Sequence, residues 1–147
     1  MNDLYYMKLA IEEAKKAFSE DEVPIGAIIV SRNRVIARAH NMTETLNDVT
    51  AHAEILAITA AENFIGGKYL RDCTMYVSLE PCVMCSGAIA WSQLSKLVYA
   101  AKDLKKGYTA VCGNILHSKI EIVTGILQLE SEALIKDFFA RKRNPKI

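Results

Sequence analysis

The stretch "TAHAEI" at residues 50–55 opens a run, "AHAEILAITAAEN" (51–63), that otherwise consists mostly of alanine, isoleucine and leucine. Such a run predicts a helix directed toward the protein interior, with Thr50 as its N-cap. The first turn nevertheless carries an imidazole, that of His52, and a carboxylate, that of Glu54. Because burying either group without a partner costs several kcal/mol, the fold must supply a partner for both.

A second stretch, "PCVMCSGAIAW" (81–91), offers that partner. Proline is tolerated at a helix start, so Cys82 and Cys85 fall in the first turn of a second predicted helix. Their sulfur atoms then project from one face of that turn. The exposed N–H groups and the dipole at a helix start favour thiolate over thiol. Two thiolates and one neutral imidazole balance the formal charge of a zinc ion.

We therefore predict that His52, Cys82 and Cys85 hold one zinc ion. Three protein ligands plus a water are the pattern of catalytic zinc, whereas structural sites normally close with four ligands. Such an ion lowers the pKa of its water to about 7 and produces hydroxide at neutral pH. Glu54 points elsewhere on an ideal helix and is poorly placed to ligate. We predict that it takes the proton of this water and delivers it to the substrate.

Each motif alone has a plainer interpretation. The C-x-x-C spacing also fits two buried cysteines or a redox pair, and His-x-Glu also fits ordinary polar residues of a capped helix. Because both motifs fall at predicted helix starts, the shared metal site is the better interpretation. Cys73 and Cys112 stand alone and are predicted to be small core residues. His40 and His117 are predicted to be hydrogen-bonded or exposed.

The hydrophobic pattern of the rest of the chain indicates alternating helices and strands. Apolar residues recur at steps of three and four across residues 3–18 and predict an amphipathic helix. The other predicted elements are a hairpin of strands at 25–30 and 34–40, the helix from Thr50 to about Asn63, a strand at 74–79, the helix after Pro81, strands at 97–101 and 120–124, and a final helix at about 130–142. This order implies a layered α/β domain with a mixed sheet of about five strands.

Length and composition favour one domain over residues 1–147, with 51% hydrophobic and 24% charged residues. A net charge of +1 gives no global basic field, but residues 136–147 hold five of the eighteen Lys and Arg residues against a single Asp. No signal peptide and no apolar stretch of membrane-spanning length is recognised. The expected location is the cytoplasm, where the four cysteines stay reduced.

The two motifs together resemble a known signature. His52-Ala53-Glu54 with Pro81-Cys82-Val83-Met84-Cys85 is similar to the zinc-dependent nucleobase deaminases of the cytidine and deoxycytidylate deaminase superfamily. Over nearly the whole chain, the resemblance is to the bacterial tRNA-specific adenosine deaminases. The segments that carry it, besides the zinc motifs, are "EVPIGAIIV" (22–30), Asn41, "YVSLEPCVMCSGAI" (76–89), Asp103 with Gly107, and "DFFARKR" (137–143).

This resemblance implies a three-layer α-β-α cytidine-deaminase-like fold with a mixed five-stranded sheet, a homodimer, and one zinc ion per subunit. The implied activity is hydrolytic deamination of the wobble adenosine in a tRNA anticodon loop to inosine, using zinc-activated hydroxide and Glu54 as a proton shuttle. Asn41 is implied to hydrogen-bond the purine, Ile25 and Gly26 to wall the pocket, and Asp103 to contact the nucleotide. The residues implied to lie along the RNA are Phe139, Arg141, Lys142 and Arg143.

Two departures from the family pattern stand out. Val49 occupies a position where many members have proline, and the segment after Gly107 is several residues shorter than in the commonest bacterial form. "GAIAW" (87–91) and "YAA" (99–101) are similar to guanine deaminases, so a free-base or nucleoside deaminase is the first alternative. A non-catalytic zinc scaffold is the second, but it would favour a fourth Cys or His close to the motifs.

Overall fold

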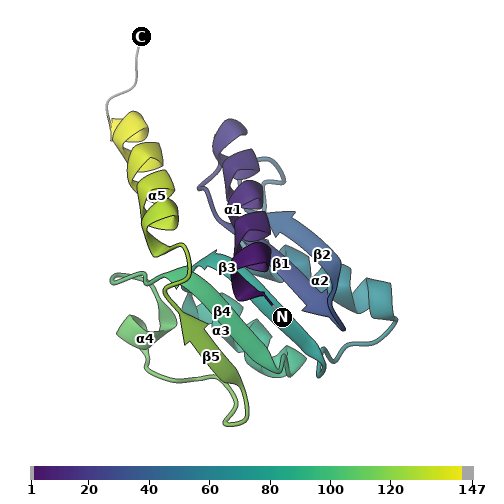
Figure 1. The fold of residues 1–147 in the computed structure, drawn as a ribbon. Coiled ribbons are helices and arrows are strands. Elements are labelled where there is room, and N and C mark those ends of the chain that lie inside the picture. The colour runs from purple at the N-terminus through teal and green to yellow at the C-terminus, as the bar shows by residue number, and fades with distance from the viewer. Residues whose placement is uncertain (1, 144–147) are drawn as a thin grey trace.

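A five-stranded sheet with helices on both faces forms the molecule (Figure 1). The structure is a computed structural model, and it describes residues 2–143. In chain order the elements are α1 (Asp3–Ser19), β1 (Gly26–Ser31), β2 (Arg34–His40), α2 (Ala53–Ile65), β3 (Cys73–Leu79), α3 (Val83–Ser92), β4 (Lys96–Ala101), α4 (Tyr108–Val111), β5 (Glu121–Thr124) and α5 (Gln128–Arg143).

The sheet is mixed, with the strand order β2-β1-β3-β4-β5. β1 pairs antiparallel with both β2 and β3, and β3, β4 and β5 run parallel. Arg32 and Asn33 turn the β1–β2 hairpin with φ angles of 49° and 65°, which match the right-handed twist of the strands they join. The parallel pair β3–β4 needs a crossover, and α3 supplies it.

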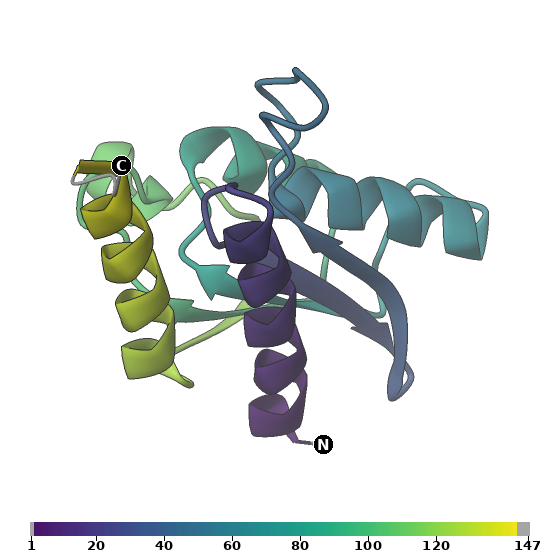
Figure 2. The ribbon, with the colours of Figure 1, turned by 90° about the horizontal axis from the view of Figure 1, so that it is seen from above.

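Alternating strand residues build two separate cores. Ile28, Tyr76 and Val98 pack on the face that α1 covers, whereas their neighbours Ile29 and Met75 pack on the opposite face with residues of α2 and α3. Figure 2 shows α1 and α5 on one side of the sheet and α2 and α3 on the other. The predicted three-layer α/β fold with a mixed five-stranded sheet is confirmed.

Three local details differ from the sequence-based expectations. Thr50 is not the N-cap of α2, because its hydroxyl donates to Asp48 Oδ1 at 2.7 Å, and the helix begins after His52 instead. A short helix, α4, was not expected. Cys112 follows it and is exposed rather than part of the core, since a single turn leaves its thiol at the surface. Cys73 is buried, as predicted.

The two remaining histidines are hydrogen-bonded, as expected. His40 lies between Glu13 and Glu20, and the Nε2 atom of His117 bonds the carbonyl oxygen of Leu94 at 2.8 Å. None of the helices within residues 2–143 combines the length and the apolar character needed to cross a membrane.

Gly26 allows helix α1 to lie directly against strand β1. A Cβ atom at this position would fall on backbone atoms of Ala10 and Ala14 and on the Cβ of Glu13. The glycine is therefore required by close packing, and backbone atoms cannot move aside as a flexible side chain can.

We expect Gly26→Ala to lower the free energy of unfolding by about 1–3 kcal/mol or more, because α1 must shift to admit the methyl group. Gly67→Ala is the matched control, since nothing lies within 4 Å of a Cβ built there. Thermal unfolding of both variants measures the difference. Equal melting temperatures for the two variants would contradict the packing argument.

Candidate active site

Three ligand-type atoms converge where helices α2 and α3 begin. His52 Nδ1 lies 3.7 Å from Cys82 Sγ and 3.5 Å from Cys85 Sγ. All three ligand atoms lie within 4.8 Å of one another, a grouping that can hold a metal ion. His52 and Cys82 are partly exposed and Cys85 is buried, so the group faces outward on one side only.

Two of these side chains, those of His52 and Cys82, are positioned by the starts of their helices. His52 is the N-cap of α2 and Cys82 is the N-cap of α3, each with an extended backbone. N-cap positions usually carry Ser, Thr, Asp or Asn, whose side chains bond the first free N–H groups. Neither His52 nor Cys82 makes such a capping bond. The imidazole and the thiol are therefore not used by their own helices and can act as ligands.

The three side chains influence one another's protonation. Hydrogen bonds with the Cys85 thiol, and secondarily with His52, outweigh burial and together lower the pKa of Cys82 to about 4. The same bond to Cys82, together with burial, raises the pKa of Cys85. Bonding to Cys82 also raises the pKa of His52. Because a metal requires deprotonated ligands, its binding must displace protons here and must strengthen as the pH rises.

Glu54 is buried in the first turn of α2, and its Oε1 atom has no hydrogen-bond partner among the described residues. Burial raises the pKa of this carboxyl to about 7. A carboxyl with such a pKa exchanges its proton readily near neutral pH, which is the property that general acid–base catalysis needs.

Asn41 is a second buried group with an unpaired atom. Its Oδ1 has no partner within residues 2–143, while its backbone N–H donates to the Ile25 carbonyl at 3.1 Å. The N–H of Met42 donates to the carbonyl of Ala51, directly before His52. The structure thus brings Ile25 and Asn41 to the start of α2. A third unpaired atom, Ser86 Oγ, lies on α3 next to Cys85 and was not predicted.

The other two predicted pocket residues have local structural tasks. The missing side chain of Gly26 admits α1, as described above. Asp103 Oδ1 accepts hydrogen bonds from the N–H groups of Lys105 and Lys106, so it closes its own turn. A nucleotide contact by Asp103 stays a prediction, as does a pocket-wall role for Gly26.

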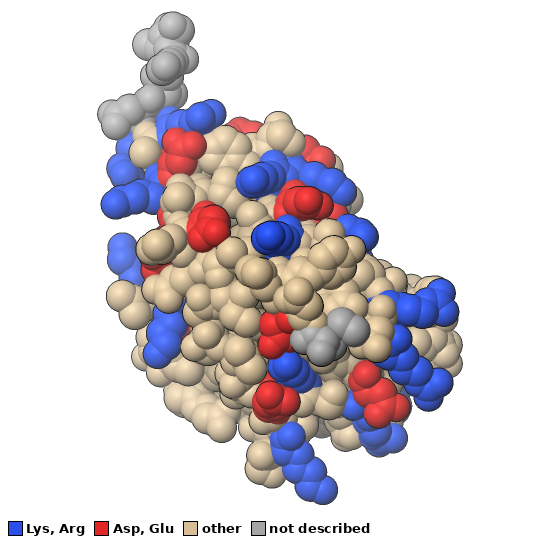
Figure 3. All heavy atoms as spheres, viewed as in Figure 1, with Lys and Arg blue, Asp and Glu red and all other residues tan. Residues whose placement is uncertain are grey.

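The predicted RNA-contact residues gather at the end of α5, where Lys and Arg cluster at the upper left of Figure 3. Two of these cations are paired within the chain. Lys142 Nζ lies 2.7 Å from Asp21 Oδ2, and Arg141 Nε lies 3.3 Å from Asp137 Oδ1. Phe139 is 42% exposed. The end of the basic tail, residues 144–147, lies outside the described residues.

A hollow of about 560 Å³ separates this end of α5 from the loop after Asn41. The residues that line it include Glu22, Thr43, Thr45, Phe139 and Lys142. The C-terminal helix therefore borders the same loop that carries Asn41.

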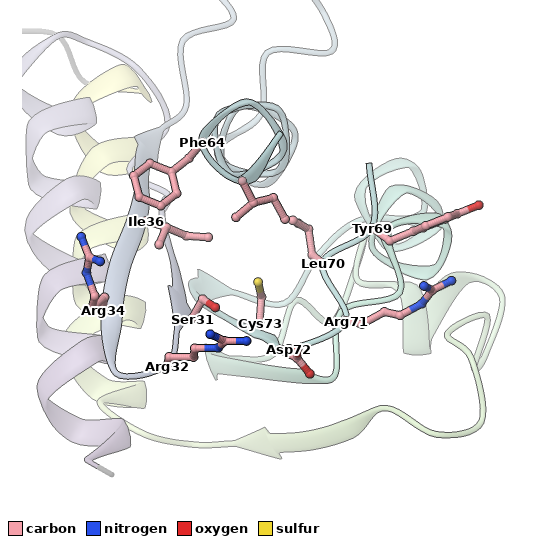
Figure 4. Close-up of a pocket in the computed structure, with 11 residues that line it drawn as sticks. Ser31, Arg32, Arg34, Ile36, Phe64, Tyr69, Leu70, Arg71, Asp72 and Cys73 are labelled. Carbon is pink, nitrogen blue, oxygen red and sulfur yellow. The ribbon is translucent and has the colours of Figure 1, made fainter. Parts of the chain in front are cut away.

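A second hollow, of about 450 Å³, lies at the opposite end of the sheet (Figure 4). The start of β3, at Cys73, and the end of β1, at Ser31, contribute to its floor, and Phe64 lies against Ile36 in its wall. Arg71 points away from it (Figure 4). The hollow contains none of the predicted site residues.

Two buried carboxylates near the site, Glu22 and Glu80, were not predicted as functional. Their signal in the sequence is weak: Glu22 is the last of three consecutive acids (20–22), and Glu80 is a single acid directly after β3. What makes them notable is their hydrogen bonding to backbone far along the chain, which no local spacing reveals.

The sequence is similar to those of known deaminases. Residues 1–143 match the family model of the MafB19-like deaminases. The tRNA-specific adenosine deaminase of Aquifex aeolicus is 43% identical, over 98% of this chain and 98% of that protein. The enzyme of the same name from Bacillus subtilis is 43% identical, over 98% of this chain and 92% of that protein.

Solved structures of deaminases are also similar to this fold. A chain from a study of A-to-I editing by tRNA:A34 deaminases is similar with a TM-score of 0.83 and 41% identity, over 88% of this chain and 98% of that one. A guanine deaminase from Nitrosomonas europaea has a TM-score of 0.80 and 27% identity, over 93% of this chain and 84% of that one.

We expect the purified protein to carry a stoichiometric metal ion that Cys85→Ala loses, because removing one thiolate leaves only two protein ligands. The same substitution lowers the melting temperature, since the buried group loses its shared partner. Elemental analysis of the purified variant measures the metal. Cys112→Ala is the control and keeps the ion, because that thiol is exposed and lies outside the group. Unchanged metal content in Cys85→Ala would remove it from the ligand set.

Proposed function

The chain belongs to the MafB19-like deaminases and to the tRNA-specific adenosine deaminases, and we propose that it converts the wobble adenosine of a tRNA anticodon loop to inosine by hydrolytic deamination. The observation that carries this proposal is the grouping of His52, Cys82 and Cys85 beside the buried carboxyl of Glu54, whose Oε1 has no hydrogen-bond partner among the described residues. Residues 1–147 then form one deaminase domain.

The metal we assign to the group is one zinc ion per chain, held by His52, Cys82 and Cys85. In a tetrahedron with zinc–sulfur bonds of about 2.3 Å and zinc–nitrogen bonds of about 2.0 Å, a nitrogen and a sulfur ligand lie about 3.5 Å apart. The distances of 3.5 and 3.7 Å between His52 Nδ1 and the two sulfurs fit this requirement. When bound, such an ion is a Lewis acid that lowers the pKa of a water ligand to about 7.

Glu54 moves the protons of the reaction. Its carboxylate takes a proton from the attacking water and delivers it to N1 of adenine as C6 is attacked. A proton then passes through Glu54 to the leaving amine, so that adenosine and water give inosine and ammonia. Proton transfer by a positioned carboxyl contributes about 10²–10⁴-fold to the rate. The raised pKa of Glu54, about 7, suits a group that must both accept and donate.

Asn41 orients the base. Its side-chain Oδ1 is buried and unpaired within the described residues, and an atom in that state gains a hydrogen bond when a purine N–H reaches it. Ile25 and Gly26 wall the pocket and Asp103 contacts the nucleotide in this proposal.

The substrate is an anticodon stem-loop, whose target base is already unpaired and is therefore less costly to extrude than a base in a duplex. Such a substrate implies a cytoplasmic location. The residues that lie along the RNA in this proposal are at the end of α5, where three cations follow one another: Phe139, Arg141, Lys142 and Arg143.

We also propose a homodimer. Helix α3 presents Trp91, which is 83% exposed, together with partly exposed Val83 and Met84. A large exposed aromatic side chain with apolar neighbours on one helix is typical of a surface that a partner covers.

Free guanine is the second candidate substrate, since a guanine deaminase shares the fold. That enzyme is 27% identical to this chain, and a guanine deaminase from Bacillus subtilis is 40% identical but covers only 69% of this chain. The tRNA-specific enzyme of Aquifex aeolicus is 43% identical over 98% of this chain, which favours the tRNA substrate. A non-catalytic zinc scaffold fits less well, because it would leave a buried carboxylate without a purpose.

Incubation of the purified protein with a panel of tRNAs, free guanine, adenine and cytosine tests the function. We expect inosine at the wobble position of at least one tRNA, with an equal amount of ammonia, and no release of ammonia from the free bases. Ammonia from guanine with unmodified tRNAs would establish the second candidate instead.

Glu54→Ala is the control for chemistry in that assay. This variant is expected to keep its zinc, because Glu54 is not a ligand, and to lose turnover. If it retained a tenth of the activity, Glu54 would not be the proton shuttle.

Neutralising the end of α5 tests the RNA surface. Changing Arg141, Lys142 and Arg143 to glutamine is expected to raise KM for tRNA and to reduce the slope of log affinity against log salt by up to about 2, the value for three lost phosphate contacts with a single strand. Lys68→Gln, a cation beside Tyr69 beyond the end of α2, is the control. An unaltered salt slope in the triple variant would mean that these cations serve only the helix end and its ion pairs.

A further inference from the structure

Glu22 is a buried carboxylate whose hydrogen bonds go to a loop and not to a Lys or Arg side chain. Its Oε2 accepts hydrogen bonds at 2.7 Å from both the N–H and the hydroxyl of Thr45, and its Oε1 accepts the N–H of Glu44 at 3.1 Å. The hydroxyl of Thr43 lies 3.5 Å from Oε1. The segment just after Asn41 is therefore attached by hydrogen bonds to the connection between α1 and β1.

Glu80 does the same on the other side of the group. Its Oε1 accepts the N–H of Asp103 at 3.1 Å, and its Oε2 accepts the N–H of Thr109 at 3.0 Å and the hydroxyl of Thr109 at 2.6 Å. A Cβ at Gly107 would collide with this carboxylate, so the loop closes tightly around it.

Both loops adjoin the candidate metal group through backbone contacts. The loop held by Glu22 begins at Asn41, and Met42 bonds the carbonyl of Ala51 next to His52. The loop held by Glu80 forms a β-bridge between Gly107 and Cys82. Each buried glutamate thus fixes one border of the same site.

We propose that Glu22 and Glu80 are positioning residues for the reaction, each holding one of the two loops beside the His52–Cys82–Cys85 group in its substrate-binding form before the nucleotide arrives. This inference rests on the proposed function, because it assigns these loops to nucleotide binding. A loop that is already ordered spares the substrate the entropic cost of ordering it, which strengthens binding.

A carboxylate suits this task better than an amide of the same size. The hydrogen-bond partners of Glu22 and Glu80 within residues 2–143 are N–H and O–H donors. Both oxygens of a carboxylate can accept such donors, whereas glutamine would turn an NH₂ toward another donor. Burial alone raises the pKa of Glu22, yet the hydrogen bonds from Thr45, Glu44 and Thr43 outweigh it and hold the pKa below its ordinary value.

The test compares Glu22→Gln and Glu80→Gln with Tyr76→Phe. The control removes a hydrogen bond made by a buried side chain, that which the Tyr76 hydroxyl donates to Asp3 at 2.7 Å, but on the α1 face of the sheet. Hydrogen exchange, zinc content, and KM and kcat for a tRNA substrate are measured on all four proteins, well below every melting temperature.

Each glutamine variant is expected to speed exchange in its own loop, residues 43–45 or 103–109, and not in the other. Zinc content stays unchanged. KM rises about tenfold with little change in kcat, because the ordering free energy is lost equally from ground state and transition state. Tyr76→Phe lowers the melting temperature and leaves KM unaltered.

Faster loop exchange with an unaltered KM in both variants would overturn the proposal, as would an equal rise in KM for Tyr76→Phe. Unaltered exchange in the held loop would overturn it as well. Failure of the proposed function looks different, because the unsubstituted protein then converts no tRNA while the exchange measurement still reports whether each glutamate orders its loop.

Discussion

The arrangement depends on two helix starts that meet on the same face of the sheet. α2 follows the antiparallel hairpin and α3 crosses between two parallel strands, and the layer that they share brings their N-caps together. Because the side chains of His52 and Cys82 make no capping hydrogen bonds to their own helices, they remain available to each other. The i, i+3 relation between Cys82 and Cys85 then adds the third ligand without any further element. A shift of either helix along the sheet would separate the three atoms.

This site is retained at an energetic cost. Asn41 Oδ1, Glu54 Oε1 and Ser86 Oγ are the buried side-chain atoms that lack hydrogen bonds within residues 2–143, and two of them belong to predicted site residues. An unsatisfied buried polar atom destabilises a fold by about 1–3 kcal/mol. The surrounding core offsets this, since apolar residues fill both faces of the sheet. A catalytic carboxyl that was fully bonded by the protein would be more stable, but its proton would be less easily exchanged.

Periodicity and motif spacing predicted most of the fold. The strands at 34–40 and 74–79 lie within one residue of their observed bounds, because short runs rich in strand-forming residues mark them. The ligand set followed from charge balance and helix-start spacing, and the structure brings those side chains together. The prediction of Thr50 as the N-cap of α2 was wrong, because the Thr50 hydroxyl bonds a nearby acid, Asp48, instead of the helix. Helix α4 is one turn long and leaves no periodic signal.

The contacts that join distant parts of the chain could not be predicted in this way. Lys142 and Asp21 are 121 residues apart, and Glu80 and Thr109 are 29 apart. Whether such residues meet depends on how the helices and the sheet pack together, and the pattern of residues in one sequence does not show this. The same limit explains why the end of α5 could be identified as basic but not as partly neutralised.

The close fit between Gly107 and the Glu80 carboxylate has a consequence for how such a sequence can change over time. Any larger residue at position 107 displaces the acid unless position 80 becomes smaller in the same lineage. A smaller residue at position 80 alone strands the amides of Asp103 and Thr109. Either first step is therefore unfavourable by itself, and we expect these two positions to co-vary rather than drift independently.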